Sequence, residues 1–327
     1  MKLLVIGCGS IGERHIRNLR SLSVDNILAC DTNSDRLHLM KEKYDAEIYK
    51  DVDEALKNKP DAVLICTPPN LHIPMALKAV EHNAHIFIEK PISHNLEKVD
   101  DFLVEVKKKK LVVSVGYNLR FHPGIRLIKK MITEGTIGKV LSARAEFGQY
   151  LPDWRPYQDY TKSYTARREA GGGIILDGSH ELDYMLWFFG DADYIFSFAE
   201  NVSSLEVDVE DVAEIFIKFK NGTLCSIHLD FVRPGYARNC ELIGERGVIA
   251  WDYLEKKINI YDSEVKNWKK IEVSFDSNDM YVEEIRHFIN VIKKEEKLLI
   301  DGYEGKKTLE LAVAAKKSAK SHKLIKL

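Results

Sequence analysis

The sequence predicts an α/β domain on a parallel sheet, followed by an α+β domain with a large, mainly antiparallel open sheet. Three observations predict this organisation. The chain has 327 residues, enough for two cores at roughly 100–200 residues per domain. Short apolar runs alternate with helix-like stretches up to about residue 117, whereas the later strands follow one another in runs. Two of the later strands flank Asn221-Gly222, which indicates a type I′ hairpin turn because both residues tolerate positive φ.

The first half contains five apolar runs rich in β-branched residues. The expected strands are Lys2–Ile6, Asn26–Cys30, Ala62–Cys66, His85–Ile88 and Leu111–Val115. Continuous apolar runs separated by helices are typical of a parallel sheet that is covered on both faces. In the first helix, His15 shares a face with Ile11 and Leu19 because the spacing is four residues. We therefore interpret His15 as a packed histidine.

The pattern changes around Asn118–Pro123, where a helix-like segment, Ile125–Glu134, begins the second half. We place the domain boundary here, so residues 1–120 form the first domain and residues 121–327 the second. The expected later elements are the strands Tyr194–Ala199, Asp211–Lys220, Thr223–Val232, Arg238–Ile243, Val248–Tyr253, Ile258–Tyr261 and Ile271–Phe275, and the helices Met280–Lys294 and Glu304–Ser321.

Composition narrows the class of function. Lysine and arginine number 48 against 50 acidic residues, so a net charge of -2 gives no general attraction to nucleic acid or to an anionic membrane. The five cysteines include no C-x-x-C pair, which argues against a disulfide framework and a zinc site. The apolar N-terminus is too short for a signal peptide, and no run approaches a membrane span. We expect a soluble cytoplasmic protein that acts on a small molecule, without metal.

A glycine motif carries the first chemical signal. Gly7-Cys8-Gly9-Ser10-Ile11-Gly12 directly follows the first strand and opens the first helix, the context in which G-x-G-x-x-G indicates dinucleotide binding. Gly7 permits the tight turn, Gly9 lets a pyrophosphate approach the backbone, and Gly12 allows close packing of helix on strand. The phosphates would accept N–H groups at the helix N-terminus. A structural turn without a ligand is the alternative.

Asp31 stands at the end of the second strand, 19 residues after Gly12. An acid at this place can accept hydrogen bonds from both hydroxyls of an adenosine ribose, which favours NAD over NADP as the cofactor. Two alternatives remain. Asp31 is also a plausible capping acid of the turn Asp31–Ser34, and Arg36 nearby leaves room for a 2′-phosphate.

Three further motifs follow in order along the chain. They are Cys66-Thr67-Pro68-Pro69-Asn70-Leu71-His72, Glu89-Lys90-Pro91, and Gly171-Gly172-Gly173 followed by Asp177 and His180. With the glycine motif, this ordered set resembles the Gfo/Idh/MocA family (glucose-fructose oxidoreductase, inositol dehydrogenase, rhizopine catabolism) over essentially the whole chain. The resemblance implies a Rossmann-type first domain that binds NAD and a second domain that binds substrate and forms the oligomer.

The resemblance also implies individual roles. Besides the glycine motif and Asp31, the implied dinucleotide contacts are Thr67, Pro68, Asn70, His72, Glu89, Lys90 and Asn118. Glu89 and Lys90 resemble the pair at the nicotinamide ribose and the reacting carbon, and Lys90 resembles the family's usual catalytic lysine. Taken alone, a lysine before a proline at a strand end is more typical of a surface cation.

His180 is the second catalytic candidate. A helix beginning near Gly173 would place Asp177 and His180 on one face, with Asp183 nearby. A histidine can accept a hydroxyl proton while a carboxylate fixes its tautomer. The commonest family pattern has the acid four residues before the histidine, where this chain has Leu176. Asp177 is therefore either the catalytic partner of His180 or a residue of the helix face, and a packed core histidine is the alternative for His180.

A stretch rich in aromatic and cationic residues, 151–168, precedes the glycine triplet. Because long loops in compact domains are often functional, we interpret it as a lid over a sugar, with Trp154 stacking on the sugar and an arginine meeting an anionic substituent. The alternative for Trp154 and Arg155 is that they simply pack the loop. The alternative for Arg120 is that it forms a salt bridge at the joint between the two domains. The expected substrate contacts are Arg120, Trp154, Arg155, Tyr160 and His180.

The expected reaction is reversible oxidation of a secondary carbinol of a sugar, sugar nucleotide or cyclitol, with hydride passing to NAD. His180 would take the hydroxyl proton, and Lys90 would orient the oxygen and stabilise its charge. A redox-neutral epimerase or glycoside-cleaving enzyme that retains NAD is one alternative, and a non-catalytic dinucleotide sensor is another. We expect a homodimer or homotetramer, because an open sheet covered by helices on one face has a second face that needs a partner.

Overall fold

The computed structural model describes residues 1–327. The chain forms two compact units. The first comprises Met1–Asn118 and Ser277–Lys307, and the second comprises Leu119–Asp276 and Thr308–Leu327. A segment near the C-terminal end of the chain therefore returns to the first unit. The structure contains no helix with both the length and the apolar character of a membrane-spanning segment.

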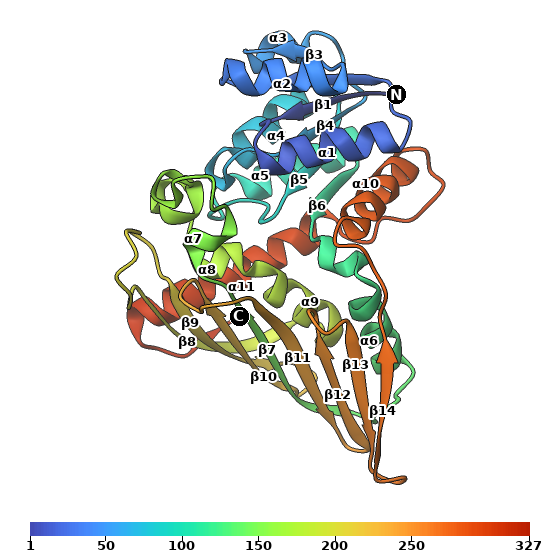
Figure 1. Ribbon diagram of the computed structural model, residues 1–327, viewed down its shortest axis with the longest axis vertical. Coiled ribbons are helices and arrows are strands. Elements are labelled where there is room, and N and C mark those ends of the chain that lie inside the picture. Colours follow the sequence, from blue (N-terminus) through green and yellow to red (C-terminus); the bar gives the residue numbers. More distant parts are fainter. The chain divides into compact units, whose positions relative to one another are not determined.

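The first unit is built on a six-stranded parallel sheet in the order β3-β2-β1-β4-β5-β6 (Figure 1). Its strands are β1 (Lys2–Ile6), β2 (Asn26–Cys30), β3 (Glu47–Tyr49), β4 (Ala62–Ile65), β5 (His85–Glu89) and β6 (Val113–Gly116). Its helices are α1 (Ser10–Ser21), α2 (Ser34–Tyr44), α3 (Val52–Leu56), the 3-10 turn η1 (Pro69–Leu71), α4 (His72–Glu81), α5 (Val99–Lys109) and α10 (Asp279–Ile292). The strand order reverses between β1 and β4, and ligands of such sheets bind at the carboxyl ends of the strands beside this reversal.

The predicted parallel sheet is confirmed. Strands β1 and β2 begin and end where the sequence predicts, because their residues are almost all buried and read as continuous apolar runs. Strand β3 was not expected. It has three residues at the edge of the sheet and none of them is fully buried, so it lacks the apolar run that marks the others.

The second unit is built on a nine-stranded sheet in the order β14-β13-β12-β11-β7-β10-β9-β8-β15. All neighbours are antiparallel except β7 and β10, so the predicted mainly antiparallel sheet is confirmed. Its strands are β7 (Val140–Gly148), β8 (Ala192–Glu200), β9 (Val212–Phe219), β10 (Leu224–Asp230), β11 (Ala237–Gly244), β12 (Gly247–Asp252), β13 (Lys257–Asp262), β14 (Asn267–Glu272) and β15 (Ile325–Lys326). Its helices are α6 (Pro123–Thr133), α7 (Leu151–Trp154), α8 (Ile174–Asp177), α9 (Ser179–Phe189) and most of α11 (Gly302–Ser321), with 3-10 turns at η2 (Asn118–Phe121), η3 (Tyr160–Lys162), η4 (Tyr164–Ala166) and η5 (Arg168–Ala170).

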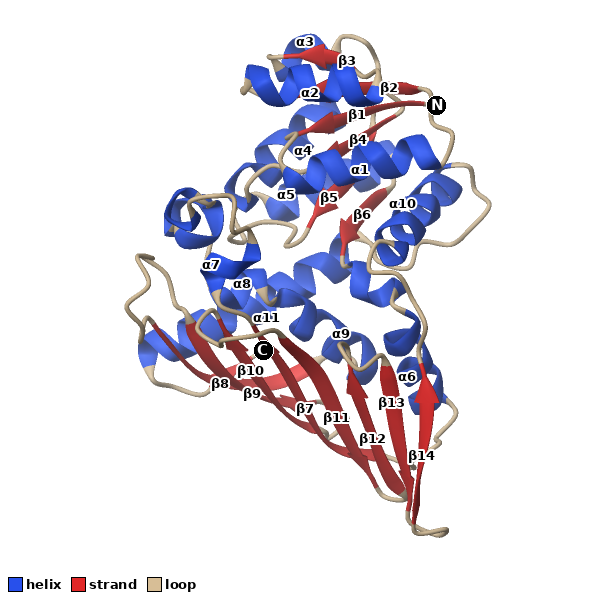
Figure 2. Ribbon diagram, in the orientation of Figure 1, coloured by secondary structure: helices blue, strands red, loops and turns tan.

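Helices cover one face of this sheet and leave the other face open (Figure 2). Strand β9 shows the consequence, since Ile215, Ile217 and Phe219 are buried whereas Phe216 and Lys218 between them are exposed. Successive strand residues point to opposite faces, so the buried set packs under the helices and the exposed set belongs to the open face.

One strand prediction needs correction, and two strands of this sheet were not expected. Strand β7 was not expected, because its inward positions Ala143 and Ala145 are small and are each followed by a charged residue, Arg144 and Glu146. The predicted strand Ile271–Phe275 is misplaced, because β14 is Asn267–Glu272 and only Ile271 and Glu272 belong to both; β14 is mostly exposed at a sheet edge and carries no apolar pattern. Strand β15, a two-residue edge strand, was also not expected.

The predicted hairpin joins β9 and β10, but its turn is not type I′. Only Gly222 adopts a positive φ, 93°, whereas a type I′ turn requires it at both central residues. The Gly222 N–H donates to the Phe219 carbonyl at 2.9 Å, and the Phe219 N–H donates to the Thr223 carbonyl at 2.9 Å. The connection is thus a three-residue loop with glycine at its left-handed position.

Candidate active site

Two glycines of the turn after β1, Gly7 and Gly12, leave no space for a side chain. Gly7 has a φ of 91°, and a Cβ there would lie 2.7 Å from the Cys66 carbonyl oxygen. A Cβ on Gly12 would lie 1.9 Å from the Gly7 carbonyl oxygen. Gly9 caps the N-terminus of α1, so the free N–H groups and the positive dipole end of that helix are presented at the turn. This geometry suits a phosphate group.

Asp31 closes the same turn. One of its carboxylate oxygens accepts the Cys8 N–H at 2.7 Å, and the other accepts the Asn33 N–H at 2.8 Å. Asp31 therefore does cap its own turn, as one of the alternatives from the sequence proposed. This capping does not compete with a ribose contact, because each carboxylate oxygen has a second lone pair. Arg36 lies with its Nη1 3.5 Å from the carboxylate and is half exposed.

These residues fit a dinucleotide. The α1 N-terminus would hold the pyrophosphate, and Asp31 would accept the hydroxyls of the adenosine ribose. On the neighbouring turn, after β4, the Thr67 hydroxyl is buried and has no hydrogen-bond partner within the protein. A buried hydroxyl in that state is costly unless a ligand pairs with it, which supports Thr67 as a cofactor contact.

We expect NAD(H) to bind at least about tenfold more tightly than NADP(H), because the 2′-phosphate would meet the Asp31 carboxylate as a like charge. Asp31→Ala is expected to narrow this difference, whereas the exposed neighbour Asp35→Ala leaves it unchanged. Fluorescence titration of both cofactors measures the effect. Equal or reversed affinities in the wild-type protein would contradict the assignment of Asp31 and favour Arg36 as a phosphate contact.

His72, expected to contact the dinucleotide, instead joins two turns of the protein. Its Nδ1 lies 2.8 Å from the Pro91 carbonyl oxygen and its Nε2 lies 2.8 Å from the Thr67 carbonyl oxygen. Burial lowers the pKa of His72, whereas the hydrogen bonds to the two carbonyls act in the opposite direction. Because both nitrogens face backbone carbonyls, His72 positions the Thr67 turn rather than offering a nitrogen to a ligand.

Glu89 and Lys90 lie at the carboxyl end of β5. Glu89 is the last residue of the strand and is buried, while Lys90 is partly exposed and precedes Pro91 through a cis peptide bond. The Glu89 carboxylate is 2.6 Å from the ring of His15, which is fully buried as predicted. The sequence pattern identified His15 only as a packed residue and gave no sign of this partner 74 residues away.

Asn118, the remaining predicted cofactor contact, is buried at the end of the first unit. A hydrogen bond links its side chain to that of Tyr281 in α10, and burial raises the pKa of Tyr281. The guanidinium of Arg14 stacks over the Tyr281 ring at 4.3 Å. Asn118 is therefore held by a segment that comes from the C-terminal part of the chain.

In the second unit, the helix expected from Gly173 onward is broken. Asp177 is the last residue of α8, Gly178 separates the two helices, and His180 is the second residue of α9. The prediction that Asp177 and His180 share a face of one helix is therefore wrong. Both side chains are nevertheless buried, with 5% and 9% of their surface exposed, as acid–base groups shielded from bulk water would be.

Tyr164 holds the carboxylate of Asp177. Its hydroxyl donates to Oδ1 of Asp177 at 2.9 Å. Burial, followed by the charge of Asp177, raises the pKa of Tyr164 well above its usual value, so the hydroxyl remains a donor. Sequence reasoning missed Tyr164, because it is one of several aromatic residues in the loop and only the fold brings it to Asp177.

Arg120 and Asp183 form a buried ion pair within the second unit. Nε of Arg120 lies 2.9 Å from Oδ2 and Nη2 lies 2.8 Å from Oδ1, so the pairing is bidentate. Both side chains are almost completely buried, and Arg120 also stacks on Trp187 at 5.5 Å. Since this guanidinium is engaged by Asp183, a substrate contact by Arg120 stays a prediction that the geometry does not favour.

The predicted lid residues lie around one small pocket. Trp154, Arg155 and Tyr160 line it together with Leu151, Gln158, Ser163 and Thr165. Trp154 also packs between Phe147 and Phe231 and donates its ring N–H to the Gln149 carbonyl at 3.0 Å, which favours the packing alternative for this residue. The structure thus brings the three predicted residues together, and their contact with a sugar stays a prediction.

Two family models match the chain. Residues 1–117 match the Gfo/Idh/MocA model described as an oxidoreductase family with an NAD-binding Rossmann fold. Residues 125–250 match the model of the Gfo/Idh/MocA C-terminal domain.

Individual relatives cover the whole chain. A myo-inositol 2-dehydrogenase of Thermotoga maritima is 33% identical over 343 residues, spanning 100% of this chain and 98% of the relative. The crystal structure of a probable dehydrogenase from Thermotoga maritima superposes with a TM-score of 0.83 at 29% identity, covering 100% and 99% of the two chains. A levoglucosan dehydrogenase in complex with NADH superposes with a TM-score of 0.90 at 20% identity, covering 100% and 98%, and so shares the fold.

Proposed function

Because the chain belongs to the Gfo/Idh/MocA family and is an NAD-dependent dehydrogenase acting on CH–OH groups, we propose that its substrate is a cyclitol or a sugar. The observation that carries this proposal is the similarity over the full chain to a protein named myo-inositol 2-dehydrogenase. A ring with several secondary hydroxyl groups is the substrate class that this similarity supports.

The proposed chemistry uses two protein groups. NAD, when bound, supplies the carbon that accepts the hydride. His180 accepts the hydroxyl proton of the carbinol, and Asp177, whose carboxylate is fixed by Tyr164, supports the resulting positive charge. Lys90 orients the carbinol oxygen and stabilises the negative charge that develops on it.

Substrate screening tests the proposal. The purified protein is incubated with NAD and a panel containing myo-inositol, other cyclitols, levoglucosan, free sugars and sugar nucleotides, and NADH absorbance is followed. We expect stoichiometric NADH formation with at least one cyclitol or sugar. Product without net NADH would instead indicate the epimerase or glycoside-cleaving alternative, and NAD binding without turnover of any panel member would indicate the sensor.

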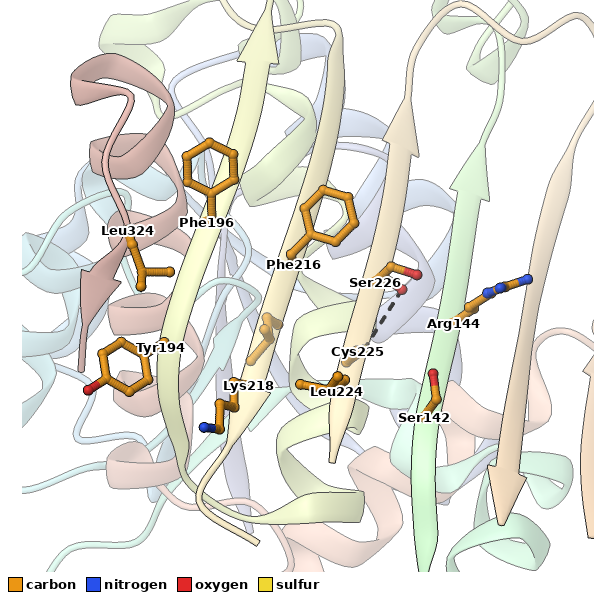
Figure 3. Close-up of a pocket in the computed structure, with 11 residues that line it drawn as sticks. Ser142, Arg144, Tyr194, Phe196, Phe216, Lys218, Leu224, Cys225, Ser226 and Leu324 are labelled. Carbon is orange, nitrogen blue, oxygen red and sulfur yellow. Dashed lines mark hydrogen bonds between the residues drawn. The ribbon is translucent and has the colours of Figure 1, made fainter. Parts of the chain in front are cut away.

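We propose further that the protein self-associates through the open face of the second sheet. Phe196 of β8 and Phe216 of β9 are direct cross-strand neighbours there, and the Phe216 side chain is 50% exposed. Both rings line a pocket that extends across β10 to Arg144 of β7, and Figure 3 shows their side chains on neighbouring strands. A second copy of the chain would cover these aromatic rings, and a twofold axis brings the same face of both copies together.

Light scattering at micromolar concentration measures the assembly. We expect the wild-type mass to be two or more times the chain mass of 37.5 kDa. We expect Phe216→Asp to lower this mass, because a charge buried at the interface is costly. Val104→Asp, at an apolar residue of α5 that is 59% exposed, is the matched control and leaves the mass unchanged. A monomeric wild-type protein would contradict this prediction directly.

A further inference from the structure

The pairing of His15 with Glu89 is unexplained by packing alone. Nε2 of His15, on α1, lies 2.6 Å from Oε1 of Glu89, at the end of β5. The imidazole is completely buried, and the Glu89 side chain is 12% exposed. Packing also contributes, since the ring meets Phe87 edge-on at 5.3 Å and Tyr281 at 6.4 Å. An apolar side chain could make those ring contacts without a hydrogen bond.

The unpaired nitrogen of His15 defines its tautomer. Nδ1 is buried and has no hydrogen-bond partner. If the ring were charged, both nitrogens would carry protons, and the Nδ1 N–H would be buried without an acceptor. The neutral ring with its single proton on Nε2 avoids this cost. His15 therefore donates its one N–H to the Glu89 carboxylate and leaves only a lone pair unpaired.

The second oxygen of Glu89 leads to Lys90. Oε2 accepts the backbone N–H of Lys90 at 3.3 Å, so His15, Glu89 and the Lys90 amide form a chain of hydrogen bonds. On the far side of Lys90, the Pro91 carbonyl faces the ring of His72 at 2.8 Å. The backbone that carries Lys90 is thus held on both sides by buried histidines.

We propose that His15 is a positioning residue, which fixes the Glu89 carboxylate against the Lys90 amide and thereby directs the Lys90 side chain. A lysine side chain has a long flexible stem, so its average direction depends on how firmly its backbone is held. This inference rests on the proposed catalytic role of Lys90. It concerns the direction of one side chain and leaves the glycine turn and Asp31 untouched.

Paired substitutions test the proposal on the full-length protein. His15→Leu keeps the side-chain bulk but removes the N–H, whereas His15→Gln retains an N–H donor near the position of Nε2. We expect His15→Leu to lower kcat by about 10–100-fold, the cost of misplacing a reacting group by about 1 Å, with the Kd for NAD changed less than about twofold. His15→Gln is expected to recover most of the lost kcat. Leu19→Ala, a buried core residue of the same helix, is the control for general destabilisation and retains kcat.

A spectroscopic measurement makes the test independent of activity and of the folding of His15→Leu. In wild-type protein with nitrogen-15-labelled histidine, we expect a hydrogen-bonded ring proton on Nε2 of His15, assigned by its absence from His15→Gln. A His15 proton on Nδ1 would overturn the inference, as would a kcat of His15→Leu no lower than that of Leu19→Ala. Lys90→Ala distinguishes a failure of the proposed catalytic role of Lys90 from a failure of the positioning role of His15. If it retains full activity, the proposed role of Lys90 fails; if it is inactive while His15→Leu is fully active, the positioning role alone fails.

Discussion

His180→Ala and Lys90→Ala are each expected to lower kcat by about 10²–10⁴-fold, the contribution of a positioned acid–base group. Both side chains are proposed to act on the carbinol. The dinucleotide is held mainly by the glycine turn, Asp31 and the Thr67 turn, so the Kd for NAD is expected to stay nearly unchanged in both variants. A loss of kcat without a loss of cofactor affinity indicates an interaction made in the transition state.

Asp177→Asn is compared with His180→Ala, and a smaller loss of kcat is expected. If the Asp177 carboxylate supports a charged His180, the substitution lowers kcat, but less than His180→Ala does. Steady-state kinetics on the active substrate, combined with NAD titration of every variant, measures these effects. Near wild-type kcat for His180→Ala across the pH range of the assay would show that the histidine is structural, and a tyrosine or lysine must then supply the base.

Asp183→Ala is expected to lower the free energy of unfolding by about 3–5 kcal/mol. The substitution leaves the Arg120 guanidinium buried, only 2% exposed, and without its bidentate partner. Removing both charges in Arg120→Met/Asp183→Leu is expected to recover much of the loss, because two apolar side chains need no partner. Denaturant unfolding, monitored by a spectroscopic signal from the second unit, measures the free energy of unfolding of the wild-type protein, of Asp183→Ala and of the double variant.

The exposed pair of Lys130 in α6 and Glu134, the residue that follows this helix, is the matched control. Their charged atoms are 3.7 Å apart, and both side chains are more than half exposed. Glu134→Ala is therefore expected to cost less than about 1 kcal/mol. An equally small loss in Asp183→Ala would mean that Arg120 finds water or another partner, and would restore Arg120 as a candidate substrate contact.

The parts of the fold that could be predicted are those set by local patterns. Strands β1 and β2 are continuous apolar runs, and the glycine motif between β1 and α1 requires only neighbouring residues. Strands β7 and β14 lack such patterns. In β7 alanines fill the inward positions, and β14 lies exposed at a sheet edge, so their pairing depends on the sheet rather than on their own sequence.

The site was predictable at the level of motifs and not at the level of contacts. His15 and Glu89 are 74 residues apart, and Arg120 and Asp183 are 63 apart, so neither pair leaves a mark in local spacing. The break at Gly178 also depends on tertiary packing, because a Cβ there would lie 2.9 Å from the Leu229 side chain of β10. The assumption of one continuous helix therefore failed at Asp177.

Hydride transfer from a carbinol carbon to NAD is tested most directly with a substrate that carries deuterium on that carbon. The protein is incubated with NAD and the labelled cyclitol or sugar, and the NADH formed is analysed by mass spectrometry and NMR. We predict one deuterium per NADH, located on C4 of the nicotinamide, and an oxidised product that has lost the label. Unlabelled NADH, or a product that keeps its deuterium while NAD stays oxidised, would contradict the proposed reaction.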